Sequence, residues 1–579
     1  MTVKGYAMAE KFVFNRALSI VALFFLLATA LSCAPIDRTW ESRTADLPET
    51  ELTTQFGKVR GFLKEDVLTW AGIPYGKTPE GSLRWRAPQD PTPWTDICEA
   101  DKERIAIQLT RGNVIGGEDS LNLTVHRPNT KESNLPILFY IHGGNNQTGE
   151  SSEIDSPILV TRLNAVVVTV NHRLDLLGFN NLPALKTGDS LEDSGNFALL
   201  DINKALDWTI ANARHFGGNP RNITISGFSA GGRDVLAILS SPVFSGKFQQ
   251  AVSFSGGLTI ADPDLSRTLI ADKLARFAVE DGIKASTEEA SRWLLSEEPE
   301  VRGYLYGLPS TRLVTAFGTG GIRMAGFPHL YADGSVLPTD GFKAGVISDV
   351  PLVLVRGGDE FSLFAVNDPY FAAARKDNAL VGEGKAANEL RFAIKYGSLL
   401  YGYANVDDVI KNFTAYKNPI YAIDVAWGNN PDIVGKEMAA LWGSHHGNFL
   451  PLITEKSFYS KSRYPDAFTG SGAKEVGTIL TAYLKNFIWH GNPNSIDLPL
   501  WEAWGDTPNL LTLDADKDTA RVFTVHPDTS YDAILDQLAA DNSITAAAKK
   551  DLLRQVFNGR WFSKKLDQRF GNKDIWIMK

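Results

Sequence analysis

Short apolar segments that alternate with helical segments constrain the fold of this 579-residue chain more than any other feature. Aliphatic and β-branched residues dominate these segments, which is typical of strands buried on both faces of a sheet. They span residues 137–141, 165–170, 223–226, 250–254 and 351–355. Leucine and isoleucine recur at helical spacing between residues 199 and 210, and Gly217 and Gly218 are expected to end that helix. The alternation predicts an α/β fold with a large, mostly parallel sheet and helices on both faces.

Three other parts of the chain depart from this alternation. Residues 53–127 contain short apolar stretches broken by proline-rich turns, which predicts an antiparallel opening. Segments 262–330 and 366–440 are expected to be cap-like insertions that cover a cleft. No stretch has the composition of a linker, so residues 34–579 are predicted to form a single domain. Hydrophobic residues make up 44% and charged residues 22%, as in a folded protein, and the net charge of −9 disfavours nucleic acid as a partner.

The first 33 residues have the pattern of an export signal. Three basic residues precede an uncharged apolar run over residues 17–31, which is short for a membrane-spanning helix but suits a signal peptide. Residues 1–33 are therefore predicted to be a signal peptide, with an uncleaved anchor as the alternative. Cys33 stands where a bacterial lipoprotein signal places its lipidated cysteine. We expect an exported protein that is periplasmic, extracellular or a cell-envelope lipoprotein. The N-terminus is the one part of the sequence expected to provide any membrane attachment.

The pentapeptide Gly227–Gly231, with the sequence G-F-S-A-G, follows directly on the strand-like residues 223–225. This pattern predicts a nucleophile elbow, a sharp turn that carries Ser229 from a strand into a helix and exposes its hydroxyl. Glycines before and after the serine leave room for the turn, because neighbouring elements pack close to it. The helix that begins there directs free N–H groups toward a developing oxyanion. Such pentapeptides are common in turns, so further groups must support the assignment.

A nucleophilic serine needs a base, an acid that orients the base, and oxyanion donors. Candidates follow the serine along the chain in the order acid, then histidine, which the α/β-hydrolase arrangement uses. Asp359 and Glu360 come after the strand-like residues 352–355, at the sheet edge where α/β sites form. His445 and His446 lie in a loop further on. The residues alone leave both carboxylates open as the acid and both histidines open as the base.

Further motifs occur along nearly the whole chain beyond the signal. They are found at residues 71–76, 83–88, 117–123, 142–144, 171–174, 195–196, 216–224, 332–334, 359–360, 446–447 and 491–494. In these motifs and in the elbow the chain resembles the type-B carboxylesterases, the cholinesterase-like family of α/β-hydrolases. The resemblance implies an α/β-hydrolase fold and hydrolysis of a small-molecule ester by a serine nucleophile, with no cofactor and no metal.

The resemblance also assigns roles to individual residues. Position by position, Ser229 corresponds to the nucleophile, Glu360 to the acid and His446 to the base. The family uses the second carboxylate of the acidic pair and a histidine followed by glycine, which favours Glu360 and His446. Asp359 as the acid and His445 as the base are the alternatives.

Gly144, Asn145 and Ala230 occupy the positions whose backbone amides form the family's oxyanion hole. Asn145 replaces a glycine there, and asparagine tolerates the positive φ that such a turn requires. Phe228 replaces the glutamate that usually precedes the nucleophile, and it is expected to contact the substrate. Two more phenylalanines replace residues that flank the acid and the base, so the surroundings of the site are expected to be more apolar than is usual in the family.

The main hypothesis is an exported serine carboxylic-ester hydrolase that acts through an acyl-enzyme. The alternatives are a catalytically inactive binding or adhesion module on the same scaffold, and the same chemistry on amides or thioesters. N-x-S/T sequons begin at Asn122, Asn146, Asn222 and Asn412. A glycan at any of the first three would obstruct the site or the fold, so we interpret the sequons as chance and the protein as bacterial. No Cys/His cluster in the sequence suggests a metal site.

Overall fold

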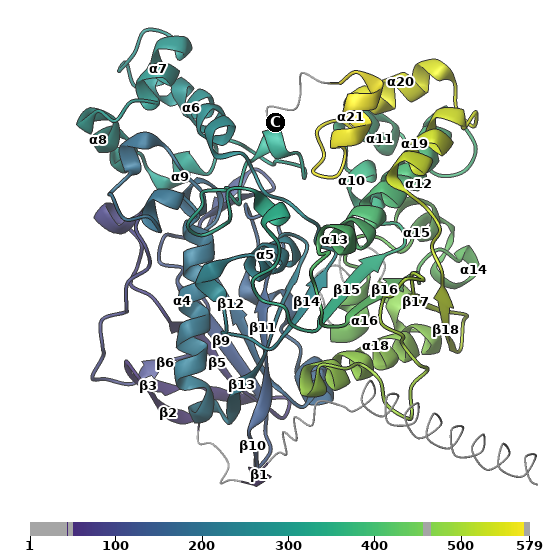
Figure 1. The fold of residues 1–579 in the computed structure, drawn as a ribbon, viewed down its shortest axis with the longest axis horizontal. Helices are drawn as coiled ribbons and strands as arrows, with labels where there is room; N and C mark the ends of the chain where they lie inside the picture. The colour runs from purple at the N-terminus through teal and green to yellow at the C-terminus, as the bar shows by residue number, and fades with distance from the viewer. Residues whose placement is uncertain (1–42, 45–49, 456–464, 573–579) are drawn as a thin grey trace, which may run out of the picture. The chain divides into compact units, whose positions relative to one another are not determined.

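The computed structural model describes residues 43–44, 50–455 and 465–572 (Figure 1). From Arg43 on, the described residues belong to one compact unit. The predicted signal peptide over residues 1–33, with Cys33, lies outside the described residues and stays a prediction. In the described part of the chain, no helix is both long enough and apolar enough to cross a membrane.

An eleven-stranded sheet runs through the described residues in the order β18-β17-β16-β15-β14-β13-β11-β12-β9-β5-β4. The strands from β12 to β17 are parallel, as the alternation of strands and helices predicted. They are β11 (Leu135–Ile141), β12 (Val166–Val170), β13 (Gly218–Phe228), β14 (Gln250–Phe254), β15 (Leu352–Gly357), β16 (Ile420–Val425) and β17 (Leu510–Ala515). The α/β-hydrolase-like sheet is therefore built around the five apolar segments seen in the sequence.

Antiparallel strands flank this parallel centre. On one side are β9 (Asn122–Pro128), β5 (Val67–Pro74) and β4 (Phe62–Lys64), and on the other side is β18 (Ala520–Val525). Smaller sheets contain β1 (Arg43–Thr44) with β10 (Glu132–Ser133), β2 (Glu51–Thr54) with β3 (Gly57–Arg60) and β6 (Cys98–Glu99), and β7 (Gln108–Thr110) with β8 (Asn113–Ile115). The antiparallel opening predicted for residues 53–127 is confirmed.

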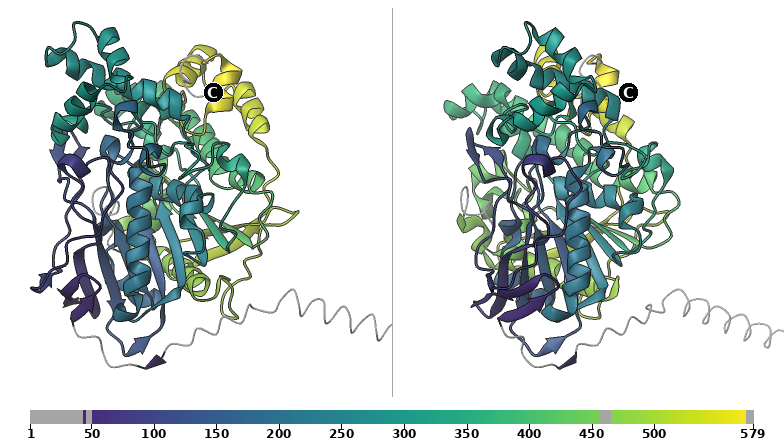
Figure 2. Two further views of the ribbon diagram at one scale, coloured as in Figure 1. Left: turned by 60° about the vertical axis from the view of Figure 1, so that its left-hand side comes forward. Right: turned by 90° about the vertical axis from the view of Figure 1, so that its left-hand side faces the viewer.

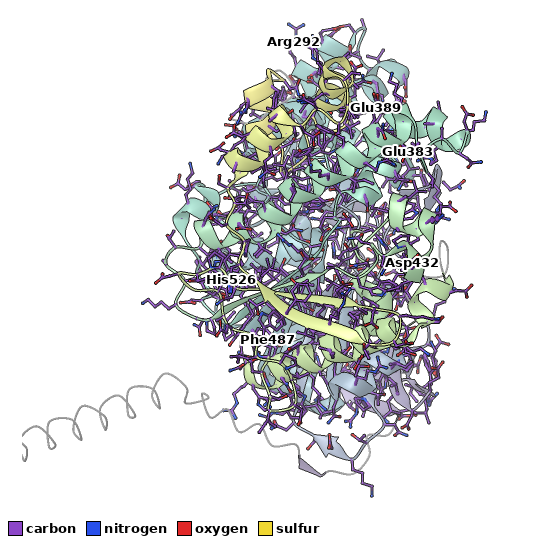
Figure 3. The ribbon with its side chains drawn as sticks, turned by 90° about the vertical axis from the view of Figure 1, so that its right-hand side faces the viewer. Arg292, Glu383, Glu389, Asp432, Phe487 and His526 are labelled. Carbon is purple, nitrogen blue, oxygen red and sulfur yellow. The ribbon has the colours of Figure 1, made fainter. Side chains whose placement is uncertain are left out.

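Helices cover both faces of the sheet (Figure 2). Leu138 and Tyr140 of β11 face a layer made of α2 (Pro157–Leu163), α16 (Phe449–Thr454) and α18 (Ser471–His490). Because side chains alternate along a strand, the intervening residues of β11 point to the other face, where α4 (Phe197–Asn212) and α5 (Ala230–Leu239) pack. Near the antiparallel edge, Phe487 of α18 packs edge-to-face against Tyr421 of β16, with 6.3 Å between ring centroids (Figure 3).

The segment between β14 and β15 forms a helical insertion. It contains α6 (Pro263–Glu280), α7 (Thr287–Leu294), α8 (Pro299–Gly307) and α9 (Ser310–Leu313). Near the C-terminus, α19 (Tyr531–Ala540), α20 (Ala546–Gln555) and α21 (Lys564–Phe570) form a second group, and both groups lie at the same end of the molecule in every view (Figures 1 and 2). The loop between α20 and α21 contacts the segment that follows α9, where the N–H of Trp561 donates to the carbonyl of Ile322.

The second predicted insertion, residues 366–440, requires a correction. It does contain helices, but it also contains β16, a parallel strand of the central sheet paired with β15 and β17. The apolar residues 420–425 belong to the sheet, although a long helical crossover separates them from β15. The helices are α10 (Ser362–Val366), α11 (Ala372–Lys376), α12 (Lys385–Asn405), α13 (Asp407–Asn412), α14 (Pro431–Val434) and α15 (Lys436–Leu441).

Candidate active site

Ser229 lies at a sharp turn between β13 and α5, as the pentapeptide predicted. Its backbone has φ 57° and ψ −112°, a conformation that side chains rarely adopt, and its N–H donates to the carbonyl of Phe254 over 2.8 Å. A Cβ on Gly227 would lie 2.4 Å from the backbone of Gly231, and one on Gly231 would lie 2.1 Å from the carbonyl oxygen of Ile141. Glycine is therefore required at both positions by the close approach of neighbouring backbone.

Glu360 and His446 come together from elements far apart in the sequence. Glu360 follows β15, and its Oε2 is 2.5 Å from Nδ1 of His446, which lies in the loop before α16. The other carboxylate oxygen accepts hydrogen bonds from the N–H of Gly357 over 2.8 Å and from the hydroxyl of Ser255. Both residues of the pair are buried. These bonds orient the carboxylate, which in turn fixes the imidazole through Nδ1 and leaves Nε2 for another partner.

The alternative acid and the alternative base are used elsewhere. Asp359 accepts hydrogen bonds from the N–H and the hydroxyl of Ser444, each over 3.1 Å. Nδ1 of His445 is 3.3 Å from the carbonyl oxygen of Gly443. The structure thus pairs His446 with Glu360 and gives Asp359 a role in holding the loop that carries both histidines.

Aromatic rings surround the imidazole of His446. Ring centroids of Phe228, Phe364 and Tyr401 lie 4.7, 5.2 and 5.5 Å from it. Nε2 of His446 is buried and has no hydrogen-bond partner among the described residues. Phe228 is buried and packs against the imidazole, with its ring under the loop of Gly447, and it is not among the residues that line the cavity described below. Its contact with the substrate stays a prediction.

The predicted oxyanion residues form a turn after β11 and the start of α5. Gly144 and Asn145 have φ angles of 104° and 59°, which asparagine tolerates better than most residues. Within the described residues, no hydrogen bond uses the N–H groups of these two residues. Ala230 is the first residue of α5, so its N–H has no partner inside the helix. Among the described residues, the N–H groups of Gly144, Asn145 and Ala230 are therefore free to bind another acceptor.

A cavity of about 200 Å³ connects these groups. Its wall contains Ser229, His446, Gly144 and Asn145, together with residues 318–322 of the first insertion. The remaining lining residues come from β7, the oxyanion turn, the start of α3 (Asp175–Gly178) and α10, and they are Leu109, Gln147, Thr148, Asp175, Leu363 and Phe364. The nucleophile candidate, the imidazole and two of the predicted oxyanion donors thus face one space.

Asp175 is the carboxyl group in this wall. Burial raises its pKa to about 7, although Nε2 of Gln147 and the N–H of Leu176 each donate to it over 2.8 Å. Its φ of 51° places it in the left-handed region. Among the described residues, no group of three or more His, Cys, Asp or Glu side chains is arranged to hold a metal ion.

Three of the four sequon asparagines are buried. The amide nitrogens of Asn122, Asn146 and Asn222 donate to the carbonyl of Arg104, the carboxylate of Asp234 and a backbone carbonyl of α18, over 2.8, 2.9 and 3.3 Å. A glycan at any of these positions would require the native packing to open, as the sequence analysis expected.

The sequence of this chain matches those of known carboxylesterases. The family model described as "Carboxylesterase family" matches residues 48–388, more than half of the chain. The chain is 35% identical over 515 residues to the acylcarnitine hydrolase of Rattus norvegicus, a match that covers 81% of this chain and 88% of that protein. The chain belongs to the carboxylesterase family.

A further relative and a solved structure are also esterases. The para-nitrobenzyl esterase of Bacillus subtilis (strain 168) is 32% identical over 338 residues, which cover 55% of this chain and 64% of that protein, or less than two thirds of its length. A solved structure titled "PNB esterase" has a TM-score of 0.63 at 24% identity and covers 82% of this chain and 97% of its own, which supports the fold. The family, the α/β-hydrolase fold and the class of carboxylic-ester hydrolases are therefore as the motifs predicted.

Sequence reasoning missed several residues that shape the site. Ser255 binds Glu360, Tyr401 stacks against His446, and Arg233 with Asp234 contacts the oxyanion turn. Ser255 had a usable signal, because it follows β14 at the carboxyl edge of the sheet where α/β sites form. The others lie inside helices, where their spacing does not distinguish them from core residues.

Proposed function

We propose that this member of the family hydrolyses carboxylic esters through an acyl-enzyme, with Ser229 as nucleophile, His446 as base and Glu360 as the orienting acid. The observation that carries the proposal is the Glu360–His446 bond of 2.5 Å, with a buried, unpartnered Nε2 on an imidazole that shares one cavity with Ser229. That arrangement supplies the base and the orienting group that a serine hydroxyl needs.

In the first half of the reaction, Nε2 of His446 accepts the hydroxyl proton as the oxygen of Ser229 attacks the ester carbonyl carbon. The carbonyl oxygen becomes an oxyanion, which the N–H groups of Gly144, Asn145 and Ala230 stabilise. Glu360 stabilises the imidazolium that forms. The imidazolium then gives its proton to the leaving alcohol as the ester C–O bond breaks, and the acyl group stays on Ser229.

In the second half, water replaces the alcohol. His446 takes a proton from the water, the hydroxide attacks the acyl carbon, and a second oxyanion forms in the same place. When it collapses, the bond to Ser229 breaks and the imidazolium returns its proton to the serine oxygen. The products are an alcohol and a carboxylic acid, and every proton is accounted for by one histidine.

The cavity limits the substrates that suit the site. About 200 Å³ is less than the volume of most pockets for drug-sized ligands, so we propose short acyl esters as the preferred class. Leu363 and Phe364 supply an apolar wall, while Gln147 and Asp175 supply a polar one. A panel of esters that differ in acyl length and in alcohol, extended to matched amides and thioesters, measures this preference as kcat/KM.

A fluorophosphonate probe and a series of variants test the proposal. Ser229→Ala and His446→Ala are each expected to lower kcat by at least about 10³-fold, because members of a triad act as a unit. Glu360→Gln is expected to lower it strongly as well, and these three variants should not react appreciably with the probe at residue 229, whereas the wild type should. His445→Ala is the matched control and should keep most activity.

Two results would contradict this proposal. A folded wild-type protein that neither reacts with the probe nor turns over any ester would favour an inactive binding module. Loss of activity in His445→Ala with activity retained in His446→Ala would overturn the assignment of the base.

A further inference from the structure

Two consecutive residues of the oxyanion turn are bonded to two consecutive residues of helix α5. Nη2 of Arg233 donates to Oδ1 of Asn145 over 2.9 Å. Nδ2 of Asn146 donates to Oδ1 of Asp234, also over 2.9 Å. We call these two hydrogen bonds the turn–helix ladder. Both hydrogen bonds join the turn after β11 to the first turn of α5, the helix that begins at Ala230.

Three of the four residues of the ladder are buried, while Asn145 is partly exposed at the cavity wall. Arg233, Asp234 and Asn146 are each at most 2% exposed. Burial lowers the pKa of Arg233 and raises that of Asp234 to about 7, so both ionised forms are costly here. Within the described part of the chain, Nη1 of Arg233 has no hydrogen-bond partner, and its Nη2 donates to Asn145. A guanidinium buried at this cost makes its best hydrogen bond to the oxyanion turn, and a hydrogen bond in such surroundings is stronger than one in water.

The turn itself needs this support. Asn145 and Asn146 have φ angles of 59° and 56°, a left-handed region that glycine enters freely and that asparagine tolerates but occupies less readily than glycine. The amide of Asn145 is held at both ends, because its Nδ2 donates to Oε1 of Gln147 over 3.0 Å while its Oδ1 accepts from Arg233. These two side-chain hydrogen bonds therefore stabilise the left-handed backbone conformation of Asn145.

The two halves of the oxyanion hole lie on the two sides of the ladder. Gly144 and Asn145 carry their N–H groups on the turn, whereas Ala230 carries its N–H on the helix. Three donors stabilise one oxyanion only if the distance between these halves is right when the charge develops. We propose that Arg233 and Asp234 are positioning residues that hold the two halves of the oxyanion hole in register. This inference rests on the proposed ester hydrolysis.

Variants of the helix residues test the proposal. Arg233→Met removes the guanidinium and keeps a long apolar side chain, and Asp234→Leu removes the acceptor. Each is expected to lower kcat by about 10-fold to 100-fold, because the donors are displaced and not lost, while KM changes by no more than about twofold. Asp234→Asn keeps an oxygen that accepts from Asn146, so it should restore kcat to near the wild-type value.

A trifluoromethyl ketone provides a readout that a purely structural role would not change. Such a ketone adds to the serine and forms a tetrahedral oxyanion, so its inhibition constant should rise by the same factor by which kcat falls. Val235→Ala is the matched control, since Val235 is equally buried on α5 and takes no part in the ladder. It should lower the melting temperature while leaving kcat and the inhibition constant near their wild-type values.

A double mutant tests whether Arg233 acts through Asn145. Asn145→Gly restores a residue that adopts the turn without strain, so Arg233→Met in that background should lower kcat no further. If the effects of the two substitutions multiply, or if folded Arg233→Met and Asp234→Leu keep the wild-type kcat, the proposal is wrong. If Arg233→Met does not fold, the kcat values of Asp234→Leu and Asp234→Asn are compared instead. A low kcat in the leucine variant with a near wild-type kcat in the asparagine variant supports the proposal, and equal values contradict it.

Failure of this inference is distinct from failure of the proposed function. Wild-type turnover that Ser229→Ala abolishes is measured first, and its absence would contradict ester hydrolysis itself. An active wild type whose ladder variants behave like Val235→Ala would contradict only the positioning role.

Discussion

Replacing Phe228 by glutamate tests the electrostatics around the imidazole of His446. The Phe228 ring is 4.7 Å from the imidazole, measured between centroids, and only 1% of the residue is exposed. A glutamate side chain reaches a similar depth, so its carboxylate would lie about 5 Å from the imidazole. A negative charge there stabilises the imidazolium, which cannot accept the proton of Ser229. The acidic limb of kcat/KM against pH should therefore move to higher pH.

The structure sets the size of this shift. Two unit charges about 5 Å apart interact by about 3 kcal/mol at an effective dielectric constant of about 20, which corresponds to about two pH units. Burial beside Phe449 and Gly447 opposes ionisation of the new carboxyl and reduces the effect. We expect a shift of about one unit toward higher pH.

The assay is kcat/KM on one neutral ester from about pH 5 to about pH 9, a range that contains the acidic limb of a histidine base. Phe228→Gln is the control, because it has the same shape as the glutamate variant and no charge. Circular dichroism and the melting temperature establish that both variants are folded. An acidic limb that coincides in the two variants, or that lies at lower pH in Phe228→Glu, would refute the reasoning.

Two further perturbations follow from the packing. Gly231→Ala is expected to lower activity by at least about 100-fold and to lower the melting temperature, because its Cβ would lie 2.1 Å from the carbonyl oxygen of Ile141. Gly303→Ala in α8, whose Cβ would meet nothing within 4 Å, is the control and should lower neither activity nor the melting temperature, so equal losses would contradict the steric argument. Burial lowers the pKa of His172 from 6.5 to about 4. Between these two pH values the unfolded chain binds a proton at His172 and the folded protein does not, so the free energy of unfolding falls as the pH drops from 6.5 toward 4. At pH 5 this lowers the free energy of unfolding by about 2 kcal/mol. Urea titrations at about pH 7 and pH 5 should therefore show a larger loss of unfolding free energy in the wild type than in His172→Phe. Equal losses in the two proteins would contradict this prediction.

Local features of the sequence were enough for the centre of the fold and for the elbow. Buried parallel strands are recognisable because both of their faces are apolar, and the turn at Ser229 is recognisable because backbone crowds Gly227 and Gly231. Family motifs then extended the prediction to Glu360 and His446, which periodicity alone leaves open. Strand β16 was assigned to an insertion because its residues follow a long run of helices, and only pairing with β15 and β17 shows that it belongs to the sheet.

The contacts that complete the site depended on tertiary structure. Glu360 meets His446 across 86 residues, while its neighbour Asp359 turns to Ser444, and no local pattern separates these two carboxylates. Phe228 packs under the imidazole and not in the cavity wall, since the direction of a side chain at a strand end depends on the loop that covers it.

Sequence by itself determined five of the buried strands, where the chain turns at Ser229, and which residue types are present for the chemistry. Tertiary structure alone decided which of them touch. Arg233 and Asp234 look like ordinary positions of α5, yet each bonds to an asparagine 88 residues away. The physical reason is range: strand and turn preferences depend on neighbouring residues, whereas hydrogen bonds between buried side chains exist only after the sheet has brought distant segments together.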